Sequence, residues 1–130
     1  MIIKNYQREV LNTLQDFVIT LAHKRDEANE ISKFMTSKGM EKTEIPYCKN
    51  SWDSLAREGK LPFLMSETSS FHVPDWIERK NGLGKLVPNI CLKVPTGGGK
   101  TLLASASIAQ IYNWFFQTTT GLIVWIVPSD

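Results

Sequence analysis

Three consecutive glycines followed by a lysine and a threonine are the part of this sequence best suited to chemistry. Gly97-Gly98-Gly99 can turn their backbone N–H groups towards an anion, because no Cβ blocks the turn or the approach. Lys100 would then contact phosphate groups, and the hydroxyl of Thr101 would ligate Mg²⁺. Thr96 belongs to the same loop. The spacing favours a phosphate-binding loop over a glycine-rich turn with an exposed lysine.

A phosphate-binding loop lies between a strand and a helix, and the flanking sequence predicts both. Residues 90–94 form a short apolar run, residues 100–117 a mostly apolar helix, and residues 122–127 a second β-prone run. A helix that begins at Lys100 would add unpaired N–H donors and the positive end of its dipole. The three segments predict an α/β fold in which two parallel strands flank a right-handed crossover helix.

Residues 5 to about 35 are predicted to be one long helix. Apolar residues recur there on one helical face, namely Val10, Leu11, Leu14, Phe17, Val18 and Leu21. Tyr6 and Gln7 lie just before this stripe. A glutamine amide can both accept from and donate to the edge of adenine, which makes Gln7 a candidate adenine-binding residue. A polar residue near a helix N-terminus is common, so a purely structural role is also consistent with the sequence.

Three short stretches of this sequence together resemble a known family. The general phosphate-loop pattern has glycine where this chain has Val94. In this respect the string from 92 to 101, LKVPTGGGKT, resembles the loop of superfamily 2 helicases, and most closely that of the R subunit of type III restriction-modification enzymes. Tyr6-Gln7 resembles the start of the Q motif of that superfamily. Residues 127–129, Val-Pro-Ser, resemble its motif Ia.

The resemblance implies a partial recA-like parallel sheet with flanking helices, preceded by the long N-terminal helix. It implies that residues 1–130 are the N-terminal portion of a helicase ATP-binding domain. Within it, residues 1–38 would hold the Q-motif-like segment and long helix, 39–88 an irregular insertion, and 89–130 the strand, loop, helix and strand. ATP and Mg²⁺ would be bound by Tyr6, Gln7, Thr96, Gly97, Gly98, Gly99, Lys100 and Thr101, with Lys100 and Thr101 in catalytic roles and Thr101 on the metal. Pro128 and Ser129 would touch the nucleic-acid backbone.

In this family ATP hydrolysis drives translocation on DNA, and a methyltransferase subunit supplies sequence recognition. The implied partners are therefore DNA, the remainder of the motor domain, and a modification subunit. Hydrolysis also needs an Asp-Glu pair after a strand and an arginine from a second lobe. The sequence contains neither pattern, so these 130 residues are predicted to bind ATP without hydrolysing it. Two alternatives stay open: another superfamily 2 helicase acting on DNA or RNA, and a non-catalytic phosphate-loop module that binds nucleotide or a partner.

Composition sets weaker limits. Apolar residues make up 42% and charged residues 22% of the chain, as in ordinary globular proteins. The net charge of +2 is too small to indicate nucleic-acid binding by itself. No signal peptide or membrane-spanning run is recognisable, which favours a cytoplasmic location. An open edge of the predicted sheet would also favour self-association.

Overall fold

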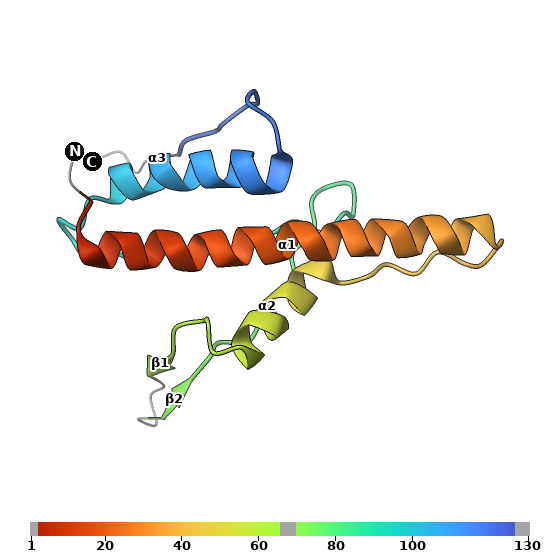
Figure 1. The fold of residues 1–130 in the computed structure, drawn as a ribbon, viewed down its shortest axis with the longest axis horizontal. Coiled ribbons are helices and arrows are strands. Elements are labelled where there is room, and N and C mark those ends of the chain that lie inside the picture. The colour runs from red at the N-terminus through yellow and green to blue at the C-terminus, as the bar shows by residue number, and fades with distance from the viewer. Residues whose placement is uncertain (1–2, 66–69, 127–130) are drawn as a thin grey trace.

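The computed structural model of the chain describes residues 3–65 and 70–126, and helices dominate these ranges (Figure 1). The longest helix, α1, spans Asn5–Ser37, and α2 spans Tyr47–Arg57. The third helix, α3, spans Lys100–Gln110 and continues directly into a π-helical turn, η1, at Ile111–Phe116.

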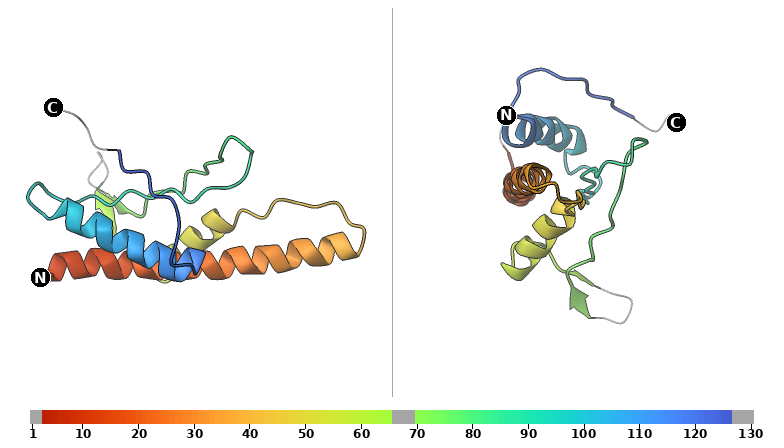
Figure 2. Two further views of the ribbon diagram at one scale, coloured as in Figure 1. Left: turned by 90° about the horizontal axis from the view of Figure 1, so that it is seen from above. Right: turned by 90° about the vertical axis from the view of Figure 1, so that its right-hand side faces the viewer.

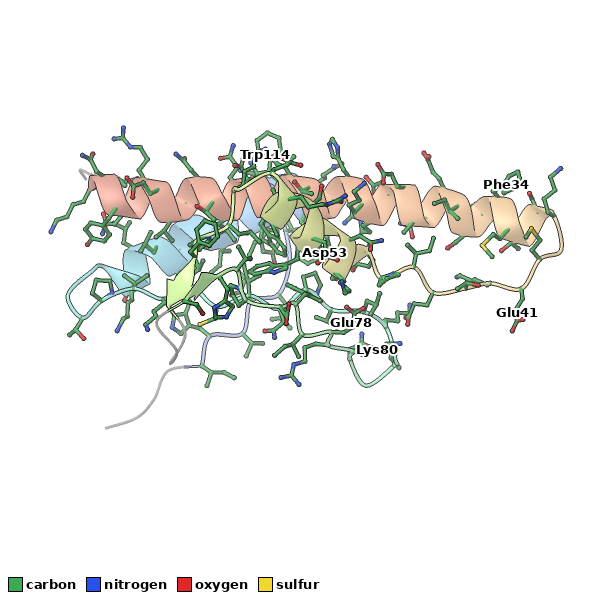
Figure 3. All side chains as sticks on the ribbon, turned by 90° about the horizontal axis from the view of Figure 1, so that it is seen from below. Phe34, Glu41, Asp53, Glu78, Lys80 and Trp114 are labelled. Atoms are coloured by element: carbon green, nitrogen blue, oxygen red, sulfur yellow. The ribbon has the colours of Figure 1, made fainter. Side chains whose placement is uncertain are left out.

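The long helix predicted over residues 5 to about 35 is confirmed as α1. Its first half buries most of the predicted stripe, namely Leu11, Leu14, Phe17, Val18 and Leu21. Its C-terminal end extends away from the other helices, and Phe34 is 59% exposed there. Figure 3 shows Phe34 at the far end of the helix. The N-terminal half of α1 is therefore the part that carries the rest of the fold, because a helix in a protein is held mainly by its packed apolar face.

On one side of α1, α2 closes the core (Figure 1). The ring of Phe17 lies 6.0 Å from that of Trp52 and 5.9 Å from that of Trp76, measured between centroids. The indole N–H of Trp52 donates to the carbonyl oxygen of Pro74 at 2.7 Å, so its polar atom is paired. This aromatic cluster attaches the irregular chain around Pro74 and Trp76 to α1 and α2.

On the other side of α1, α3 and η1 run alongside it in the same direction (Figures 1 and 2). They occupy nearly all of the helix predicted over residues 100–117. Hydrogen bonds mark both ends of this packed pair. At the start, Nε2 of Gln7 donates to the carbonyl oxygen of Gly98 at 2.9 Å. At the end, Nη1 of Arg25 donates to the carbonyl oxygen of Phe115 at 2.7 Å. Two contacts so far apart along α1 fix how the helices align.

The predicted parallel sheet is wrong. In the described part of the chain the one sheet is a short antiparallel pair, β1 (Leu64–Met65) with β2 (Phe71–His72). Residues 90–94 and 122–126 are irregular, and neither stretch makes a backbone hydrogen bond to the other. Residue 127 lies outside the described ranges. A parallel strand exists only when neighbouring strands complete its hydrogen bonds and cover its faces, and nothing in 3–65 or 70–126 does this for these two runs.

The interval predicted to be an irregular insertion, residues 39–88, is partly regular, because it contains α2 and the β1–β2 pair. The remainder of that interval is held by scattered contacts. One is the ion pair between Lys80 and Glu44, and another is the isolated bridge between Lys80 and Leu86. No helix in the described ranges combines the length and apolarity needed to cross a membrane.

Candidate functional site

The glycine loop, residues 95–99, leads into the N-terminus of α3 and lies beside the N-terminus of α1 (Figure 1). Gly97 and Gly99 have φ angles of +76° and +75°. Residues that carry a side chain rarely adopt this left-handed backbone conformation, so both positions favour glycine. The backbone N–H of Gly98 donates to the carbonyl oxygen of Pro95 at 2.9 Å. The loop is therefore a tight turn and not an open connection.

The first turn of α3 offers backbone donors next to this loop. Gly99 is the N-cap residue, and no side chain caps the helix. The first backbone bond after the loop runs from the N–H of Leu103 to the carbonyl oxygen of Gly99 at 3.0 Å. The N–H groups of Lys100, Thr101 and Leu102 therefore have no intrahelical acceptor, as expected of a first helical turn. The side chains of Lys100 and Thr101 are exposed beside these donors, and Thr96 is exposed in the loop.

Hydrogen bonds from the first turn of α1 hold the loop in place. The hydroxyl of Tyr6 and Nε2 of Gln7 each donate to the carbonyl oxygen of Gly98, both at 2.9 Å. Oε1 of Gln7 accepts from the backbone N–H of Lys4, also at 2.9 Å, which caps α1. Gln7 is only 5% exposed, and Gly98 is buried. Sequence analysis placed Tyr6, Gln7 and the glycines in one site, and the structure brings them into direct contact.

This contact was not foreseen in its detail. The sequence suggested that the Gln7 amide meets the edge of adenine, whereas in the structure its oxygen and its nitrogen both bond to backbone groups. Neither composition nor spacing distinguishes these two uses of a glutamine, because both need one donor and one acceptor. The adenine contact stays a prediction, and it would require the amide to exchange or share these bonds.

The acidic pair that hydrolysis would need is distant from the loop. The sequence has one Asp-Glu dipeptide, Asp26-Glu27, which lies within α1 on exposed positions. Along a helix that rises about 1.5 Å per residue, Asp26 is roughly 28 Å from Gln7. Glu27 pairs with Lys24 at 2.9 Å. In residues 3–65 and 70–126, no three His, Cys, Asp or Glu side chains gather in a way that could hold a metal ion. Pro128 and Ser129, predicted to touch nucleic acid, lie outside the described residues.

Two hollows among the described residues lie away from the loop. A cavity of about 720 Å³ opens between the middle of α1 and α2, and its lining includes Lys24, Glu27, Asp53 and Arg57. A second, apolar hollow of about 360 Å³ is lined by parts of α1, α3 and the two irregular runs, for example Leu14, Ile108, Ile90 and Ile123. Neither is lined by a residue of the glycine loop. The loop is therefore a surface site, which suits a phosphate group better than an apolar ligand.

Comparisons with known proteins add no relative. No protein-family model matches the chain, and no curated protein or solved structure shows a significant similarity to it. The resemblance to superfamily 2 therefore depends on the short motifs alone.

Proposed function

We propose that the glycine loop binds the phosphate groups of a nucleotide, and that ATP with Mg²⁺ is the natural ligand. The observation that supports this most directly is the arrangement of donors. The Gly98 carbonyl is bonded to α1, while the uncapped first turn of α3 and the side chains of Lys100 and Thr101 are exposed next to the same loop. Backbone N–H groups at a helix N-terminus attract anions, and an adjacent lysine adds a full positive charge.

The residues at the loop would have separate roles. Lys100 would contact the terminal phosphates as a point charge with three donors. Thr101 would contribute one hydroxyl oxygen to Mg²⁺, an ion that keeps several waters and takes its other ligands from phosphate oxygens. A single protein ligand is thus compatible with a site that has no cluster of acidic side chains. Thr96 and the glycines would supply the turn and its backbone donors.

The proposal extends to the class of protein through the motifs. A chain with this loop and with Tyr6-Gln7 would belong to an ATP-dependent translocase of superfamily 2, similar to the type III restriction R subunit. It would act in the cytoplasm on DNA, together with further motor elements and a modification subunit. Binding without hydrolysis is expected of the 130 residues, because Asp26-Glu27 is too far from the loop to position Mg²⁺ and water. That same observation favours the second candidate, a nucleotide-binding module with no catalytic role.

Titration calorimetry with Mg-ATP tests the proposal. A hydrogen bond to a charged partner contributes about 1.5–3 kcal/mol, so Lys100→Ala should weaken binding by about ten- to a hundredfold. Lys93→Ala is the matched control, because Lys93 is also exposed and precedes the loop. It removes the same charge at a position outside the residues proposed to bind ATP, which begin at Thr96. Equal losses in both variants would reduce the effect to general charge, and binding that is unchanged in Lys100→Ala would exclude a phosphate loop.

A further inference from the structure

We infer that Tyr6 and Gln7 are positioning residues: together they fix the Gly98 peptide group, so that the glycine loop binds phosphates equally well whichever base the nucleotide carries. The inference rests on the proposed function, since it takes the loop as the phosphate-binding element. It assigns the two residues a role that does not depend on adenine.

Hydrogen bonds fix the orientation of the peptide group that follows Gly98. Two donors from α1 converge on one carbonyl oxygen, the Tyr6 hydroxyl and Gln7 Nε2, each at 2.9 Å. The N–H of the same residue is bonded to Pro95. In a trans peptide group the C=O of one residue and the N–H of the next point in opposite directions. The bonds that hold the Gly98 carbonyl towards α1 therefore direct the N–H of Gly99 away from α1.

A glycine loop needs such support to keep its peptide groups in one orientation. Glycine has little intrinsic preference between left- and right-handed conformations, so peptide groups between glycines can rotate at low cost. A rotated Gly98 peptide would present its carbonyl oxygen where an anion is to bind, and the two negative groups would repel each other. The start of α1 is suited to prevent this, because its stripe from Leu11 onwards is buried in the core.

The side chain of Gln7 is itself held in place. Its amide is fixed at both ends, by the N–H of Lys4 and by the Gly98 carbonyl, and its side chain is almost wholly buried. A Cβ built on Gly99 would lie 2.6 Å from Nε2 of Gln7, so the loop and this amide are in close contact. These contacts leave the amide suited to holding the loop more than to meeting a base.

Binding of three ligands to the full chain separates the two roles. Mg-ATP, Mg-GTP and inorganic tripolyphosphate share the phosphates but differ in the base or lack it. Tyr6→Phe and Gln7→Met each remove one donor to the Gly98 carbonyl, nearly keep the size of the side chain and add no charge. A typical hydrogen bond contributes about 0.5–1.5 kcal/mol, so each variant should lose about two- to tenfold in affinity. The loss should be the same for all three ligands and larger in the double variant.

The control is Arg25→Met, which breaks the contact at the other end of the α1–α3 pair and leaves the loop intact. It should bind tripolyphosphate as wild type does. A loss confined to ATP would overturn the inference in favour of adenine recognition. Unchanged affinity in the double variant would overturn it outright, as would an equal loss in Arg25→Met.

Amide hydrogen exchange in the ligand-free chain provides a readout independent of binding. Residues 96–101 should exchange faster in Tyr6→Phe and Gln7→Met than in wild type, and at the wild-type rate in Arg25→Met. If wild type binds none of the three ligands, the proposed function is wrong. The exchange rates alone then test whether Tyr6 and Gln7 fix the glycine loop. Unchanged exchange in both loop variants would show that the two donors do not fix the loop.

Discussion

Gly99 lies so close to the side-chain amide of Gln7 that a larger residue at position 99 would collide with it. A methyl group added to Gly99 would lie 2.6 Å from Nε2 of Gln7, closer than real Cβ contacts come, while the same addition to Gly97 meets nothing within 4 Å. The two glycines otherwise share a nearly identical backbone conformation, with φ of +75° and +76°. The pair therefore separates backbone strain from the contact with α1.

Gly99→Ala should consequently destabilise the fold more than Gly97→Ala does. Both variants carry the strain of a side chain in the left-handed region, about 1–2 kcal/mol. Gly99→Ala additionally displaces the Gln7 amide from its acceptor, which costs about 1–3 kcal/mol for a buried group. Urea unfolding of each variant gives the difference. In a Gln7→Ala background the extra cost of Gly99→Ala should disappear, and a double-mutant cycle without coupling would contradict the contact.

Local periodicity was sufficient for the helices predicted over residues 5–35 and 100–117 and insufficient for the sheet. The stripe from Leu11 to Leu21 determines which face of α1 is buried. An apolar face can pack against any apolar surface, so its burial does not depend on one specific partner. The run over 122–126 is equally apolar, yet it is not a strand, because a strand needs a specific neighbour for its hydrogen bonds. Leu122 and Ile126 are each 89% exposed in consequence. Propensity describes what a segment can do, and pairing decides whether it does so.

The candidate site was predictable in its members and not in its bonds. The glycines at 97–99 could be identified because positive φ angles and close approach both require them. That the Gly98 carbonyl receives two side chains from a segment some ninety residues earlier has no signature in the sequence. Arg25 was missed entirely, because it belongs to a charged run that is typical of a solvated face.

Arg25 should contribute measurably to stability. Its guanidinium donates to the Phe115 carbonyl at 2.7 Å and lies 4.5 Å from the centroid of the Phe115 ring. Arg25→Met keeps the apolar part of the side chain and loses both interactions, together with an ion pair to the exposed Asp26 at 3.0 Å. We expect a loss of about 1–3 kcal/mol in urea unfolding. The neighbouring Lys24→Met breaks only an exposed ion pair with Glu27 and should cost less than about 1 kcal/mol. Similar costs for the two variants would mean that the Phe115 contact adds nothing.

The two cysteines should differ in reactivity. Cys48 is 1% exposed, whereas Cys91 is exposed. Burial raises the pKa of the Cys48 thiol from 9.0 to about 11, so the reactive thiolate is scarce as well as inaccessible. With iodoacetamide at neutral pH, Cys91 should be alkylated in the folded chain and Cys48 only after unfolding. Peptide mass spectrometry assigns the site, and prompt labelling of Cys48 in the native protein would contradict its burial.

Alkaline pH should destabilise the fold through the same region. Burial also raises the pKa of the neighbouring Tyr47, to about 12. Each group loses its proton more readily in the unfolded chain, so the unfolded state binds fewer protons once the pH exceeds the ordinary thiol value of 9.0. The contribution of these two groups to stability should therefore be constant below pH 9 and fall as the pH rises towards 11 and 12. Cys48→Ala should flatten the first part of this fall, while Cys91→Ala should leave it unchanged.

Residues 122–126 should make the chain associate with itself at high concentration. Their exposures alternate, with Leu122, Val124 and Ile126 at 74–89% and the two residues between them at 48–49%, so one apolar face points outwards. No backbone N–H of residues 122–126 donates a hydrogen bond within the described structure, which leaves the backbone edge of this segment able to pair with another chain. Val124→Lys places a charge on the edge, and sedimentation velocity over a concentration series should show association weakened by about tenfold or more. Leu83→Lys is the control, because Leu83 is 81% exposed in a different loop, and it should associate as wild type does. A wild-type chain that stays monomeric throughout, or equal weakening in both variants, would rule out this edge as the contact.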